Sequence, residues 1–180
     1  MQSFILARER DASKITQYAE LLGKMLAKRI VDEGIATANA EIVLREGLPL
    51  TDYGLATEIW VTPAQVNGAW TTYVNAALGQ RRYSAHYGIS NLSANPGISA
   101  VRYQVGANGA NTMAVIPCEA MYAELVISAY FTPPVFYKPG EQVFIQTYGN
   151  FAQTERFVLR SLVAEPSGNV SAPRLETRMV

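Results

Sequence analysis

The first periodic pattern in the chain lies near its N-terminus, from Asp11 to about Gly34. Apolar residues recur there at steps of three and four positions, the spacing of one face of an amphipathic helix. The stripe consists of Ile15, Tyr18, Ala19, Leu22, Leu26 and Ile30. The apolar face of such a helix must be covered by other protein atoms. Because the helix lies near a terminus and the chain is apolar for its length, we expect at least partial burial of this face in a contact between subunits. Packing against the same chain is the alternative.

Downstream of this helix the period changes to two, which is typical of a strand with one buried face. Tyr83, Ala85, Tyr87 and Ile89 alternate with polar or small residues, and the same alternation recurs over 101–105. Further strands are predicted at 41–45, 55–61, 124–131, 142–148 and 156–164. The stretch 67–78 fits either a strand or a short helix, and the Asn67-Gly68 turn favours the strand.

Turn residues separate these strands, at Asn67-Gly68, 106–109, Pro139-Gly140 and Gly149-Asn150. No crossover helix fits between consecutive strands, so a parallel sheet is not expected. The pattern predicts a mainly β protein, an antiparallel, jelly-roll-like β-sandwich with an N-terminal amphipathic helix.

We expect three parts along the 180 residues. Residues 1–50 form a helical segment or arm, and residues 51–165 form the sandwich. Residues 166–180 mix proline, serine, glycine and charges without periodicity, and they are predicted to be an extended arm.

Composition and charge limit the choice of partners. Hydrophobic residues make up 49% of the chain and charged residues 17%, whereas charged residues usually supply about a quarter. Such a chain favours buried interfaces. Fifteen basic and fifteen acidic residues cancel, which argues against nucleic acid as a partner.

The apolar run at 4–7 is too short for a secretion signal, and no stretch approaches the roughly 20 apolar residues of a membrane span.

The chain offers little material for catalysis. His86 is its one histidine, and we expect it to be exposed or at an interface, on the strand face opposite the tyrosines. Cys118 is its one cysteine and is expected to be a small buried hydrophobe. One histidine and one cysteine cannot form a zinc site, and the glycine-containing loop 106–111 lacks the lysine of a phosphate-binding loop. We therefore expect no enzyme activity, no catalytic or metal site and no cofactor.

One basic and aromatic cluster stands out, formed by Arg81, Arg82, Tyr83 and Tyr87. Stacking on tyrosine beside a guanidinium can hold a sugar or a single-stranded nucleic acid, but an ordinary strand face or a subunit contact is the simpler interpretation. The candidate interface consists of this cluster and the helix residues Ile15, Tyr18, Leu22, Leu26 and Ile30.

The stretch from 97 to 166 resembles structural proteins of tailed bacteriophage particles, in particular capsid decoration or cement proteins. The similar segments are GISAVRYQVGANG, ELVISAYFTPPVFYKPGEQVFIQTYG and ERFVLRSLVAEP. They include the Pro133-Pro134 pair, the Tyr137 to Gly140 turn and a last strand that ends in Ala164-Glu165-Pro166.

The resemblance implies a non-enzymatic virion protein, made in the host cytoplasm and placed on the capsid surface. It also implies a homo-oligomer, in particular a trimer, that binds and stabilises the lattice of the major capsid protein. Two alternatives remain. One is a glycan- or receptor-binding module of a phage tail or adhesin, with an aromatic platform around Trp60, Trp70 or Tyr83. The other is a capsid-forming single jelly roll.

Overall fold

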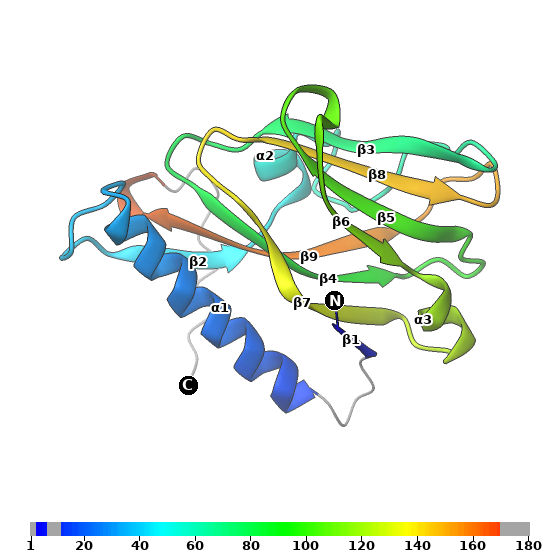
Figure 1. Ribbon diagram of the computed structural model, residues 1–180, viewed down its shortest axis with the longest axis horizontal. Coiled ribbons are helices and arrows are strands. Elements are labelled where there is room, and N and C mark those ends of the chain that lie inside the picture. The colour runs from blue at the N-terminus through cyan, green and yellow to red at the C-terminus, as the bar shows by residue number, and fades with distance from the viewer. Residues whose placement is uncertain (1–2, 7–11, 170–180) are drawn as a thin grey trace.

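The computed structural model describes residues 3–6 and 12–169, and two facing β-sheets dominate it (Figure 1). The strands are β1 (Ser3–Leu6), β2 (Ile42–Glu46), β3 (Ala69–Ala77), β4 (Tyr83–Asn91), β5 (Ile98–Val105), β6 (Asn111–Pro117), β7 (Ser128–Tyr137), β8 (Gln142–Gly149) and β9 (Phe157–Pro166). The helices are α1 (Ala12–Asp32), α2 (Pro49–Tyr53) and α3 (Glu119–Ala123), with 3-10 turns η2 (Ala107–Gly109) and η3 (Ser167–Asn169).

The strand order identifies a jelly roll. Sheet A has the order β1-β7-β4-β9-β2 and sheet B the order β3-β8-β5-β6, with every pairing antiparallel. From β2 to β9 the chain passes to the other sheet at each connection except β5 to β6. This two-sheet, eight-strand arrangement is the jelly roll, extended at one edge by β1. The fold class predicted from the sequence is confirmed.

The connections gather at two ends of the sandwich. Because neighbouring strands are antiparallel, the segments 47–68, 92–97, 118–127 and 150–156 all lie at one end, which we call the loop end. The shorter turns after β3, β5 and β7 lie at the opposite end. The turns predicted at 106–109 and Pro139-Gly140 are among them.

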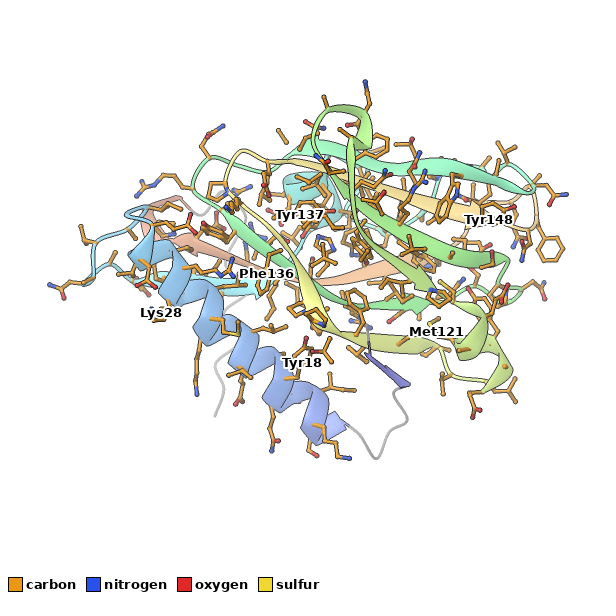
Figure 2. The ribbon with its side chains drawn as sticks, in the orientation of Figure 1. Tyr18, Lys28, Met121, Phe136, Tyr137 and Tyr148 are labelled. Carbon is orange, nitrogen blue, oxygen red and sulfur yellow. The ribbon has the colours of Figure 1, made fainter. Side chains whose placement is uncertain are left out.

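Sheet A is covered on both faces. Its inner face packs on sheet B in the main core, which includes Tyr103, Phe131 and Leu159. Its outer face carries α1 in a second core that includes Leu26, Ile30 and Tyr83. Figure 2 shows the two sides of β7, where Phe136 lies toward α1 and the next residue, Tyr137, lies toward the sandwich interior.

This double cover explains why strand β4 departs from simple alternation. All nine of its residues are buried, and its register shifts between His86 and Gly88. The bulge moves Ile89 to the main core although Tyr83 and Ala85 face α1. A Cβ atom on Gly88 would lie 2.7 Å from Cδ1 of Tyr130, so glycine permits the close approach of β7 at this bulge.

Two predicted boundaries are wrong. β2 pairs with β9 along five residues, so the sandwich begins before residue 51 and the predicted segment 1–50 is not a separate part. Pro166 is the last residue of β9, and most of the predicted arm 166–180 lies outside the described residues.

Two predicted strands also differ from the strands that the structure contains. Residues 55–61 are irregular and belong to the long β2–β3 connection. Directly after them, the Thr62 N–H donates to the Glu155 carbonyl at 2.9 Å, which ties this connection to the β8–β9 loop instead of to a sheet. The predicted strand 124–131 begins only at Ser128, after α3 and a turn.

Leu22 and its neighbour Leu21 provide a matched test of the helix packing. The side chain of Leu22 is 1% exposed and that of Leu21 is 55% exposed. We expect Leu22→Ala to lower the free energy of unfolding by about 2–4 kcal/mol, because it leaves a cavity under the helix. Leu21→Ala is expected to change it by about 0.5 kcal/mol or less. Urea denaturation of both variants checks this, and equal effects would contradict the assigned helix orientation.

Candidate functional site

The predicted helix stripe packs against its own chain. Leu22, Leu26 and Ile30 are at most 1% exposed without any neighbouring subunit. The expected burial between subunits is therefore wrong for these three residues, because sheet A already covers them. Ile15 and Tyr18 are half-buried nearer the start of the helix.

The predicted tyrosines help to seat this helix. Tyr83 is fully buried in the core below α1. The ring of Tyr87 lies edge-on to Tyr18, with centroids 6.2 Å apart, and stacks on Tyr130 at 5.8 Å. The Tyr18 hydroxyl donates to the carbonyl of Phe131 at 3.1 Å. Tyr83 and Tyr87 are thus packing residues, so they do not form an exposed platform.

The two arginines of the predicted cluster separate. Arg81 is exposed and donates to the carbonyl of Ile35 at 3.0 Å. Arg82 is buried and points into the sandwich, where it contacts two carboxylates. The structure therefore does not bring Arg81, Arg82, Tyr83 and Tyr87 together on one surface.

Arg82 belongs to a closed ring of four charges, which we call the ion ring. Arg45 contacts Asp52 at 2.6 Å and Glu165 at 2.8 Å. Arg82 contacts the same carboxylates, Asp52 at 3.2 Å and Glu165 at 2.7 Å. Both carboxylates are fully buried, and the arginine side chains are 15% and 10% exposed.

The ion ring is suited to structure more than to chemistry. Each buried charge has two partners of opposite sign, so the desolvation of the four groups is offset within the ring. Asp52 also accepts the backbone N–H of Leu48 at 2.7 Å, which fixes the start of α2. The ring therefore ties α2 to β2, β9 and the start of β4. Arg45 and Asp52 are seven residues apart, but Arg82 and Glu165 lie far from them in the sequence, and the four belong to no motif, so the sequence could not reveal the ring.

His86 is buried between the two sheets, so the prediction that it is exposed or at an interface is wrong. Its ring lies 5.2 to 5.4 Å from the rings of Tyr53, Tyr103 and Tyr137. Desolvation by burial lowers the pKa of His86 to about 3. Neither ring nitrogen has a hydrogen-bond partner in the described part of the chain. At neutral pH this imidazole is uncharged, and its place on the strand face opposite Tyr83 follows the predicted alternation.

Cys118 is fully buried, as predicted, in the main core. Burial raises the pKa of its thiol well above the ordinary value. Within residues 3–6 and 12–169, no three or more histidine, cysteine, aspartate or glutamate side chains gather where they could hold a metal ion. The helices in these ranges are all too short or too polar to cross a membrane.

The loop end carries a surface that the sequence did not predict. Several of its large apolar side chains are exposed. We use the name apolar loop-end surface for five of them, which are between 44% and 91% exposed: Ile59, Leu92, Leu125, Ile127 and Phe151. They come from all four connections at this end. Ile59 and Leu92 line one shallow pocket, and Leu125 and Ile127 line a second. The apolar run at 125–127 was visible in the sequence but was assigned to the predicted strand 124–131.

A buried carboxylate holds these loops in place. Glu155 is 1% exposed, and its side chain accepts from Asn91 at 2.6 Å and from the Gly97 N–H at 2.9 Å. Its backbone N–H donates to the Thr62 hydroxyl at 3.0 Å. These bonds link the connections after β2, β4 and β8, which carry Ile59, Leu92 and Phe151 of the apolar loop-end surface.

Comparison of the chain with protein-family models, curated proteins and solved structures finds no match. The resemblance to phage decoration proteins stays a prediction.

Proposed function

We propose that the chain is a non-enzymatic structural protein of a virion, which binds and stabilises a lattice of major capsid protein. In this proposal the protein forms a homo-oligomer, and the apolar loop-end surface makes the contact with the capsid. Two features support the proposal: the sequence resemblance to phage decoration proteins, and the exposed apolar loop-end surface, which is suited to contact with another protein.

The observation that carries the proposal is the backbone and exposure of Leu125. Its side chain is 91% exposed, and its φ of 54° lies in the left-handed region, which is unfavourable for leucine. Neither property stabilises the isolated chain. Strained residues and exposed apolar clusters are both typical of interaction sites, and here they coincide at Leu125, which lines one pocket together with Ile127.

The arrangement of the reactive groups supports the same class of function. His86 and Cys118 are packed in the core, and the four charges of the ion ring neutralise one another. These groups contribute to packing and are not presented to a substrate. Jelly rolls occur in capsid proteins and lectins, so the fold alone supports the proposal only by analogy.

Cosedimentation tests the proposed contact. The purified protein is mixed with preformed shells of the major capsid protein from the same virus, and light scattering measures its own oligomeric state. The double variant Leu125→Asp/Ile127→Asp is expected to bind at least about tenfold more weakly, because burying a carboxylate without a partner is costly. Aspartate tolerates the left-handed backbone better than leucine, so the variant should fold.

Leu21→Asp is the matched control, because it places a carboxylate on an exposed leucine of α1, away from the loop end. It is expected to bind as wild type. Failure of the wild-type protein to bind shells, or full binding by the double variant, would contradict the proposal. Shell formation by the chain alone would instead identify it as a capsid-forming jelly roll.

A further inference from the structure

The outer face of sheet B is a second surface, independent of the loop end. The outer face of sheet A carries α1, whereas in the described chain no comparable helix lies on this side of sheet B (Figure 1). The turn η2 covers Phe144 and Gln104 at one end of the face. The remainder of the outer face of sheet B is accessible: Thr72 is exposed and Trp70 is half-buried.

Strand register brings a distinct set of side chains together on this face. Trp70 of β3 lies opposite Tyr148 of β8, and Thr72 lies opposite Gln146. Arg102 of β5 also lies opposite Gln146. Directly opposed residues of antiparallel strands point to the same side of a sheet, so these five residues share one surface.

The contacts of this cluster fix its geometry. The guanidinium of Arg102 lies 4.4 Å from the ring centroid of Trp70 and donates to the side-chain oxygen of Gln146. The ring of Tyr148 is edge-on to Trp70 at 5.4 Å. Gln146 donates in turn to the Thr72 hydroxyl at 3.5 Å. The aromatic pair, the amide and the cation are therefore held side by side.

No described residue neutralises the charge of Arg102. Within the described residues its contacts are with an aromatic ring and an amide, and it forms no ion pair. This contrasts with Arg45 and Arg82, which each contact two carboxylates. The cluster thus presents one uncompensated positive charge beside two rings, an amide and a hydroxyl.

We propose that this face binds an acidic saccharide. The C–H face of a sugar ring packs on the accessible parts of Trp70 and Tyr148, as apolar C–H groups do on aromatic rings. A carboxylate of the saccharide accepts hydrogen bonds from the guanidinium of Arg102 in a charge-assisted contact. Gln146 and Thr72 exchange hydrogen bonds with sugar hydroxyls. The ligand class is thus set by the combination of rings, neutral polar groups and a single cation.

An array of purified bacterial polysaccharides, some containing uronic acids and some neutral, tests this proposal. The wild-type protein is expected to bind uronic-acid members and not neutral ones. Calorimetry on an oligosaccharide of the strongest hit then compares variants. Arg102→Gln and Trp70→Ala are each expected to weaken binding at least about tenfold, through loss of the charged contact and of the aromatic surface.

The matched control is Arg81→Gln, which removes an exposed arginine outside this face, and it is expected to bind as wild type. Raising the salt concentration should weaken binding by the wild type more than by Arg102→Gln, because salt screens the ionic contact. Arg102→Gln keeps the test valid if Trp70→Ala fails to fold. The proposal is overturned if no acidic saccharide binds, if neutral ones bind equally well, or if Arg102→Gln binds unchanged.

Discussion

Asp52→Asn is expected to lower the free energy of unfolding by about 3–5 kcal/mol, the usual cost of removing one partner from a buried ion pair. Asp52 contacts both Arg45 and Arg82, so the substitution removes one of the two buried carboxylates that these guanidinium groups share. Denaturant unfolding followed by circular dichroism measures the change.

The exposed pair Lys28–Asp32 on α1 is the control for this prediction. Its side chains are 75% and 54% exposed, so water already screens the charges. Lys28→Ala is expected to change the free energy of unfolding by about 0.5 kcal/mol or less. Similar losses in Asp52→Asn and Lys28→Ala would show that the ion ring does not hold α2 and the sheet together.

His86→Phe is expected to reduce the loss of stability in acid. The unfolded chain binds a proton near pH 6.5, but burial lowers the pKa of His86 to about 3 in the folded protein. Between these values the unfolded state holds more protons, so stability falls as the pH falls through this window. From pH 7 to pH 4 the histidine accounts for a loss of about 3 kcal/mol.

Phenylalanine has no proton to bind, so the variant should lack this part of the acid sensitivity. Its ring can keep the contacts with Tyr53, Tyr103 and Tyr137. It also removes nitrogens that have no partner in the described chain, so stability at pH 7 should be equal or higher. Urea unfolding of both proteins at several pH values measures the difference. Parallel pH curves would contradict the buried, neutral state of His86.

Local patterns predicted most strands of this fold because each strand carries its own signal. Alternation located β4 and β5, and the turn residues at Pro139-Gly140 marked the β7–β8 connection. The same patterns failed at 55–61, where an apolar segment belongs to a long loop fixed by Glu155. A strand and an apolar loop of this length have similar sequences, and only the segments with which they form backbone hydrogen bonds distinguish them.

The stripe on α1 shows a second limit of sequence patterns. Periodicity established that Leu22, Leu26 and Ile30 are buried, but it did not indicate whether their partner lies in the same chain. That partner is sheet A, whose strand β4 has apolar residues on both faces. The ion ring and the sheet B cluster escaped prediction for a related reason. The members of the sheet B cluster meet through strand register, and the ion ring also depends on where α2 and the segment before β4 lie in the fold.

Electron cryo-microscopy of virus particles purified from the source of the chain tests the proposed capsid function most directly. The account predicts jelly-roll density at regular positions on the shell, with Leu125, Ile127 and the rest of the apolar loop-end surface facing the major capsid protein. Particles that lack the chain, or density with the loop end directed away from the shell, would contradict it.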